Sequence, residues 1–266
     1  MRDPLAFPMY AVNHCDTNAL WLAIQGLLVA RGVPVGSLTP VLPQEELMAH
    51  WQNPQLILSQ TCGYPLVTQL LDVQVVGCFH YTAPGCESIY YRSVLVVREE
   101  DKQQTFADFR DRPVVCNSTD SQSGYNVLMK MVTPLAVNGR FFSRVVLSGS
   151  HRQSLHDVKR GEGDIAAIDC VTWALLQRHE PTLLDGLAII DQSPLAPGLP
   201  LITAGETSPD MLAALSEVLH TLVSAAEYRE ICAALLIGGF SEVTRQPYSR
   251  LLDWRKAAQT AGIARL

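Results

Sequence analysis

The sequence predicts an α/β protein in which one domain is inserted into another, and three observations support this prediction. The chain has 266 residues, of which 48% are hydrophobic and 17% charged, so it can form one large core or two ordinary ones. Short β-branched runs alternate with segments of helical periodicity, as in α/β layers. Two segments rich in proline and glycine interrupt this alternation.

The chain begins with a predicted helix and continues as a β/α alternation. Asp16 and Thr17 are N-cap candidates for this helix, and Gly32 stands where a residue just past a helix end is expected. Strands are expected at 55–59 and 73–78, and Tyr64-Pro65 opens a helix between them that ends near Leu71.

The middle of the chain continues the same alternation with further short, buried strands. Strands are predicted at 93–97, 113–116, 144–147, 165–168 and 187–190, and helices at about 123–131, 154–160 and 171–179.

Two crossing segments divide the chain. Residues 193–200, which read S-P-L-A-P-G-L-P, can propagate neither helix nor strand, and a second crossing is expected near Pro84. Beyond them Ser208 and Pro209 occupy the N-cap and first position of a long helix, followed by helices at 228–236 and 249–261. We therefore expect one discontinuous domain from 1–86 and 195–266, with 87–194 inserted into it.

Charge and cysteine content exclude several kinds of protein. Lys and Arg number 20 against 26 Asp and Glu, and no basic run occurs, so nucleic-acid binding is not expected. No apolar run is long enough to span a membrane. Seven cysteines with no C-x-x-C or Cys/His spacing favour reduced, mostly buried thiols, and we expect neither a metal nor a cofactor.

Small polar residues cluster at 117–125, N-S-T-D-S-Q-S-G-Y, between a predicted strand and a predicted helix. The first amides of a helix are unpaired and carry partial positive charge, so this stretch can surround a tetrahedral oxyanion without any lysine. Ordinary helix capping explains a Ser/Asp cluster equally well and stays open as the alternative.

Five segments in the same order resemble the periplasmic phosphonate-binding proteins of ABC transporters. Residues 121–125, S-Q-S-G-Y, resemble that family's S-T-S-G-(F/Y) loop, and 91–97, Y-R-S-V-L-V-V, resemble its Y-x-S-V-L-x-V segment. The turn S-G-S-H at 148–151, the strand entry G-E-G-D-I-A at 161–166 and the stretch at 193–200 are similar to three further family segments. Each match is weak alone, but their shared order is specific.

The resemblance implies the two-lobed, type 2 periplasmic-binding-protein-like fold. Each lobe is then a mixed, mainly parallel sheet flanked by helices, and hinge motion through 84–91 and 191–200 closes a ligand cleft between the lobes. It also implies reversible binding of a small anion, such as a phosphonate or phosphate ester, for transport or sensing. An ABC permease or a sensor protein is the implied partner.

Ligand-contacting residues follow from the resemblance position by position. Ser121, Gln122 and Ser123 become donors to the oxyanion, and Gly124 permits close approach. Two residues from other matched segments, Tyr91 and His151, complete the implied set in this part of the chain.

Departures from the family pattern change the expected ligand. Aminoalkylphosphonate binders place acids where this chain has Leu199 and Val171, so an ammonium-bearing ligand is not favoured. Asp169, at the end of a predicted strand, is instead a candidate specificity residue. Gln122 replaces the family threonine and adds an amide that the ligand can meet.

A second loop is expected to contact ligand from the other lobe. Thr61 and Cys62 lie beside Tyr64 in the turn after the first lobe's strand, although a simple strand–helix turn with Tyr64 in the core remains the alternative. Tyr10 follows the likely first strand, at the edge where open α/β sheets bind ligands.

A function of another class stays open. Cys62, Cys170 or Cys15 beside His151 or His14 could supply nucleophile and base to an enzyme of small-metabolite metabolism on the same scaffold. The location is open as well, because the resemblance implies the periplasm whereas the cysteine content and the polar start of the chain are typical of the cytoplasm.

Overall fold

The computed structural model describes residues 5–33, 35 and 47–266, and the chain divides into two compact units. The first unit comprises Met1–Thr82, Glu87–Ile89 and Pro197–Pro247, and the second comprises Ala83–Cys86, Tyr90–Ala196 and Tyr248–Leu266. Residues 1–4 of the predicted first lobe lie outside the described part of the chain.

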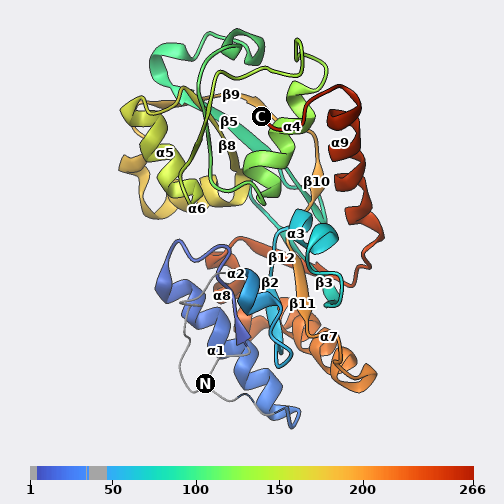
Figure 1. Cartoon of the computed structure of the whole chain (residues 1–266). Coiled ribbons are helices and arrows are strands. Elements are labelled where there is room, and N and C mark those ends of the chain that lie inside the picture. The colour runs from blue at the N-terminus through green and yellow to red at the C-terminus, as the bar shows by residue number, and fades with distance from the viewer. Residues whose placement is uncertain (1–4, 34, 36–46) are drawn as a thin grey trace. The chain divides into compact units, whose positions relative to one another are not determined.

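The first unit is a five-stranded mixed sheet packed against helices (Figure 1). The sheet order is β1-β2-β11-β3-β12, in which β1 runs parallel to β2 and the other neighbours are antiparallel. Its strands are β1 (Leu5–Ala6), β2 (Leu58–Gln60), β3 (Gln74–Tyr81), β11 (Pro200–Thr203) and β12 (Ile237–Ser241), and its helices are α1 (His14–Ala30), α2 (Leu47–Trp51), α3 (Gly63–Thr68), α7 (Pro209–Ser224) and α8 (Arg229–Ala234).

The core of the first unit lies between this sheet and helices α1, α7 and α8. Leu20, Ile24 and Leu28 of α1 pack with Leu215 and Leu219 of α7, and all five side chains are buried. Burial of a leucine side chain contributes about 1.5–3 kcal/mol, so this shared apolar face holds the helices on the sheet.

The second unit is also a five-stranded mixed sheet, with the order β7-β6-β8-β5-β9 (Figure 1). Here β6 is parallel to β7 and β8, whereas β5 is antiparallel to β8 and β9. Its strands are β5 (Ser93–Arg98), β6 (Val114–Cys116), β7 (Val145–Leu147), β8 (Ile165–Asp169) and β9 (Leu187–Gln192), and its helices are α4 (Val127–Val132), α5 (His151–Arg160), α6 (Cys170–His179) and α9 (Ser249–Thr260). Two more short strands, β4 (Tyr90–Tyr91) and β10 (Ala196–Pro197), pair with each other.

The predicted mixed α/β fold is confirmed, with local differences in strand direction, in the 193–200 crossing and at a helix cap. The sequence analysis expected mainly parallel sheets, but antiparallel strand pairs are common. In the first unit this is because β11 and β12 both run antiparallel to β3. The 193–200 crossing does contain strand residues, since Pro200 opens β11, a position where a strand tolerates proline. The N-cap of α1 is Asn13, whose side chain accepts from two backbone amides, and not Asp16 or Thr17.

The end of the chain groups with the second unit, whereas the sequence analysis expected all of 195–266 in the first lobe. Helix α9 packs against α4, and its residues Leu251 and Ala258 are fully buried. The backbone N–H of Leu266 also donates to the hydroxyl of Tyr125 at 3.2 Å. These contacts, which sequence periodicity does not reveal, decide the grouping.

None of the helices in the described residues is long and apolar enough to span a membrane. Within the same residues, no group of three His, Cys, Asp or Glu side chains is placed to hold a metal ion.

Candidate functional site

The polar cluster at 117–125 leads from β6 into a helix whose first turn is widened. Ser121 is the N-cap, with its hydroxyl accepting from the Gly124 amide at 3.0 Å. A π-helical turn then covers Gln122–Asn126 before α4 continues as a regular helix. Single π-helical turns occur frequently at functional sites. The sequence analysis expected a plain α-helix from about Ser123, so the π-turn is a correction.

At position 124 a neighbouring side chain occupies the space that a Cβ atom would fill. A Cβ built on Gly124 would lie 1.9 Å from Oδ1 of Asn117, far inside contact distance. The close approach expected of Gly124 therefore involves Asn117 of the same loop. The close contact between Gly124 and Asn117 holds the two ends of the loop together.

Two serines from distant segments hold the loop backbone in place. The Ser93 hydroxyl donates to the Ser123 carbonyl oxygen at 2.9 Å. The Ser193 hydroxyl in turn accepts from the Ser93 amide at 2.9 Å, and the Ser193 amide donates to the Ser93 carbonyl at 2.8 Å. All three side chains are buried. The serines of the Y-x-S and S-P-L segments thus position the loop, a role the sequence analysis missed.

Several donors of the loop have no acceptor among the described residues. The backbone amides of Gln122 and Ser123 make no hydrogen bond there, as expected for the first turn of a helix. The side-chain Oε1 of Gln122 accepts from Asn126, but its Nε2 is buried and unpaired within that part of the chain. An unpaired buried donor costs about 1–3 kcal/mol, so an oxyanion at this turn would remove a penalty as well as add bonds.

The imidazole of His151 forms a hydrogen bond with the Ser123 hydroxyl. Its Nε2 lies 2.8 Å from Ser123 Oγ and 3.5 Å from Asp169 Oδ2. Two oxygens facing one nitrogen favour a proton on Nε2, and the buried Nδ1, which no described residue meets, is then the unprotonated nitrogen. With the proton on Nε2, the ring donates to Ser123 Oγ, and the serine hydrogen is available for another acceptor.

Burial keeps this imidazole neutral. It lowers the pKa of His151 below the ordinary 6.5, and the Asp169 carboxylate only partly opposes the shift. A neutral ring adds no positive charge to this turn, so what the turn offers to an anion is its hydrogen-bond donors.

The Ser123, His151 and Asp169 side chains lie together but are not arranged as a catalytic triad. A triad base accepts the serine proton on one ring nitrogen while the carboxylate holds the other nitrogen. Here serine and carboxylate both face Nε2. The carboxylate of Asp169 is also committed to capping α6, with Oδ1 accepting from the Thr172 amide at 2.8 Å and Oδ2 from the Thr172 hydroxyl at 2.6 Å.

The three cysteines considered as nucleophiles of an enzyme lie in three different places. Cys170 Sγ meets the thiol of Cys86. Cys15 and His14 are both exposed on α1, and Cys62 is the buried residue preceding α3.

Acidification is expected to destabilise the protein through His151. The unfolded chain takes up a proton on this ring near pH 6.5, but the folded protein does so only at lower pH, so stability falls as the pH drops below 6.5. The loss is at most about 1.4 kcal/mol per pH unit for one such group. Urea unfolding at pH 7.5 and 5.5 measures it.

His151→Gln provides the control for this pH dependence because it removes the titrating group. The pKa of His80 is also lowered by burial, but His80 is present in both proteins and cancels in the comparison. Equal pH dependence for the two proteins would contradict the assignment.

The remaining predicted residue of this unit, Tyr91, lies in β4 and is 3% exposed.

The first unit contains the residues predicted for the second loop. Thr61 follows β2 and is fully buried, and no described residue pairs with its hydroxyl. Cys62 precedes α3 and is buried, whereas Tyr64 within α3 is partly buried. Tyr10 is buried, with its ring 5.0 Å from that of Tyr81 in an edge contact.

Gln60 and Tyr81 belong to this cluster and were missed from the sequence. The Gln60 amide donates to the Tyr81 hydroxyl at 3.0 Å, and both residues line a small pocket with Tyr10 and Thr17. Gln60 directly precedes Thr61, and Tyr81 is the last residue of β3. These two positions in the sequence are the signal that could have pointed to this cluster.

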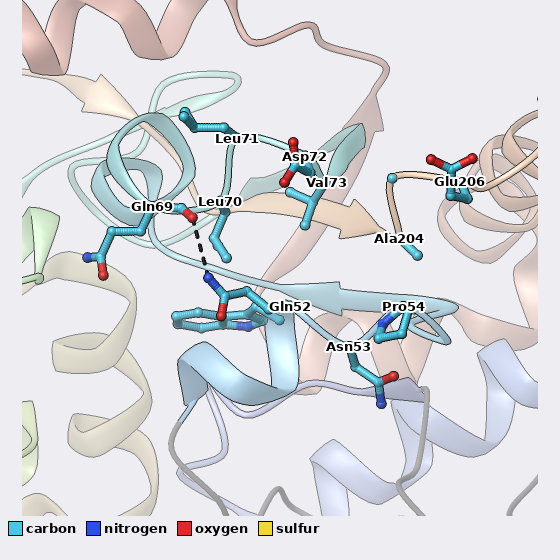
Figure 2. Close-up of a pocket in the computed structure, with 12 residues that line it drawn as sticks. Gln52, Asn53, Pro54, Gln69, Leu70, Leu71, Asp72, Val73, Ala204 and Glu206 are labelled. Carbon is cyan, nitrogen blue, oxygen red and sulfur yellow. Dashed lines mark hydrogen bonds between the residues drawn. The ribbon is translucent and has the colours of Figure 1, made fainter.

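A larger cavity of the first unit has the wrong charge for an anion. Its volume is about 380 Å³, and Figure 2 shows the Gln52 side chain reaching toward Gln69, to whose carbonyl it donates at 3.5 Å. The carboxylates of Asp72 and Glu206 lie on the segments that line the cavity. Carboxylates repel an oxyanion, so the charge of this cavity does not favour an anionic ligand.

A family model agrees with the matched sequence segments. The model described as "ABC transporter, phosphonate, periplasmic substrate-binding protein" matches residues 82–248. A comparison with curated protein sequences found no match.

Solved structures share the fold over nearly the whole chain. PhnD1 from Prochlorococcus marinus in complex with methylphosphonate is 14% identical with a TM-score of 0.77, and 96% of this chain and 97% of that chain are covered. A binding-protein component of an ABC phosphonate transporter from Pseudomonas aeruginosa is 15% identical with a TM-score of 0.76, covering 98% and 88%. A Xanthomonas citri protein bound to ATP is 13% identical with a TM-score of 0.70, covering 97% and 98%.

Proposed function

Because the chain belongs to the family of periplasmic substrate-binding proteins of phosphonate ABC transporters, we propose that it binds a small phosphonate or phosphate ester at the Ser121–Ser123 turn. Membership makes it a solute-binding protein, with a small ligand and a transporter permease as its partners. The family binds its substrates and is not a family of enzymes.

The arrangement of donors around Ser123 is the observation that supports this site most directly. The Ser123 hydroxyl lies 2.8 Å from His151 Nε2 and is left free to donate to a ligand when that nitrogen carries the proton, and the amides of Gln122 and Ser123 have no acceptor among the described residues. Each donor to a charged group contributes about 1.5–3 kcal/mol, so these three donors supply favourable contacts to an anion without a lysine or arginine.

The ligand that fits best carries no ammonium group. Leu199 and Val171, which stand where aminoalkylphosphonate binders have acids, are both buried and apolar. Asp169 does not replace those acids, because its two oxygens already cap α6. A simple alkylphosphonate, such as the methylphosphonate bound by the Prochlorococcus relative, is therefore our proposed ligand class.

A thermal-shift comparison tests this assignment. We expect methylphosphonate at about 100 times its Kd to stabilise the protein by about 2.7 kcal/mol, which raises Tm by several degrees. 2-Aminoethylphosphonate should shift Tm less, because Leu199 and Val171 are apolar where aminoalkylphosphonate binders have acids, and acetate should not shift it. A larger shift with the aminoalkyl compound, or none with any phosphonate or phosphate ester, would contradict the proposal.

A further inference from the structure

Two thiols of the second unit lie close enough to react with each other. The Sγ atoms of Cys86 and Cys170 are 3.4 Å apart, although 84 residues separate them in sequence. Cys86 closes a turn in which its amide donates to the Ala83 carbonyl at 3.0 Å. Cys170 is the first residue of α6.

The backbone around the pair brings the two thiols together. A Cβ built on Gly85 would lie 3.3 Å from Cβ and 3.4 Å from Sγ of Cys170, so the turn itself lies against this residue. Gly85 has φ +99°, a left-handed conformation that favours glycine. The Cys170 amide also donates to the Arg92 carbonyl at 3.0 Å. A disulfide bond of about 2.0 Å requires the two sulfur atoms to approach further from their separation of 3.4 Å.

The two thiols differ in ways that suit a stepwise exchange. Cys86 is partly exposed, whereas Cys170 is buried. The hydrogen bond from Cys86 lowers the pKa of Cys170, although burial and the Asp169 carboxylate oppose this shift. Burial instead raises the pKa of Cys232, and that of Cys116 to about 12, so these two thiols stay protonated.

We propose that Cys86 and Cys170 form a reversible intramolecular disulfide by exchange with a disulfide oxidant. The Cys86 thiolate attacks one sulfur of the oxidant, a mixed disulfide forms, and the first oxidant thiolate leaves. The Cys170 thiolate then attacks Sγ of Cys86 and releases the second thiolate. Two electrons pass to the oxidant, whose two thiolates take up the two protons that the cysteines have lost.

The bond would fix the 83–86 turn on the first turn of α6. Cys170 directly follows Asp169, the N-cap of this helix. Asp169 lies 3.5 Å from Nε2 of His151, which contacts Ser123, so the cross-link would be next in sequence to a residue of this cluster. Its formation does not depend on which ligand the protein binds.

Peptide mapping under non-reducing conditions tests the proposal on the full chain. Chymotrypsin cuts after aromatic residues, which isolates Cys86 in residues 82–90, Cys170 in residues 143–173 and Cys15 in residues 11–21. After treatment with oxidised glutathione we expect residues 82–90 joined to residues 143–173, and after dithiothreitol we expect the two peptides apart. The treated protein should lose two of its seven thiols.

Matched variants complete the test. Oxidation should raise the Tm of the wild-type protein and of Cys15→Ser, which removes an exposed thiol, but not that of Cys86→Ser. Absence of the joined peptide in oxidised wild-type protein, or an equal Tm rise in Cys86→Ser, would overturn the proposal. Because the mapping needs no ligand, a failure of methylphosphonate binding would leave its outcome unaffected.

Discussion

Replacing Ser123 by alanine is expected to weaken methylphosphonate binding by about ten- to a hundredfold. The substitution removes the hydroxyl that His151 leaves free to donate, and one donor to a charged group is worth about 1.5–3 kcal/mol. The loop should keep its shape, because Ser93 holds it through the Ser123 carbonyl oxygen and not through the side chain. Isothermal titration of the purified variant measures the loss.

Two neighbouring serines provide the comparison for this variant. Ser121→Ala should weaken binding on the same scale but also lower Tm, because its hydroxyl caps the Gly124 amide and such caps contribute about 1 kcal/mol. Ser118→Ala should bind like the wild type, since that hydroxyl only accepts from the Asp120 amide in an exposed turn. Wild-type affinity in both Ser123→Ala and Ser121→Ala would rule out the proposed site.

Replacing Asp164 by asparagine is expected to destabilise the protein by about 2–4 kcal/mol, the largest stability change we predict. Oδ1 of Asp164 accepts from Arg98 at 2.6 Å, and Oδ2 accepts from Arg112 at 2.8 Å. Asp101 contacts Arg112 from the other side at 2.9 Å. The side chain of Asp164 is only 16% exposed, so an amide there leaves two guanidinium groups poorly paired in a region with little water.

The effect of Asp164→Asn should depend on pH. Burial would raise the pKa of Asp164, but the hydrogen bonds from Arg112 and Arg98 outweigh it, and the pKa lies below the ordinary 3.8. The stabilisation is therefore complete above pH 3.8 and is lost as the pH falls through the lower folded value.

Urea unfolding at pH 7 and at acid pH measures this change, with Glu100→Gln as the control. Glu100 also meets Arg98, but its side chain is 74% exposed, so we expect little change in stability. Equal unfolding midpoints for wild type and Asp164→Asn at pH 7 would contradict the account.

Asp164 also explains a segment that the sequence analysis identified only by resemblance. In G-E-G-D the first glycine, Gly161, ends α5 with φ 78°. A Cβ on the second, Gly163, would lie 2.5 Å from a methyl carbon of Val115 on β6. The aspartate then joins the two arginines. The segment is thus a structural support of the second unit.

Local signals allowed much of the fold to be predicted. Ser208 and Pro209 cap α7 as expected, because N-capping depends on neighbouring residues only. The position of the 121–124 loop between a strand and a helix was also predicted from its own residues, whereas its role in ligand binding stays a prediction. The N-cap of α1 was misplaced because Asn13 and Asp16 are both good caps, and only the observed backbone distinguishes them.

Long-range contacts account for what the sequence did not reveal. Ser93 and Ser193 are hydrogen-bonded although a hundred residues separate them, and no periodic pattern in the sequence predicts this pairing. The same holds for Cys86 and Cys170 and for the position of α9 beside α4. The contact between Gly124 and Asn117 at the π-turn likewise appears only once the loop is folded.

An NMR titration of the backbone amides tests the central claim most directly, because it reports on the two N–H groups themselves. With uniformly ¹⁵N-labelled protein and methylphosphonate, we predict large downfield proton shifts for Gln122 and Ser123, as expected when an amide gains a charged acceptor. Gly124, whose amide already donates to Ser121, should move less. Saturable binding that leaves the Gln122 and Ser123 amides unshifted would contradict the account.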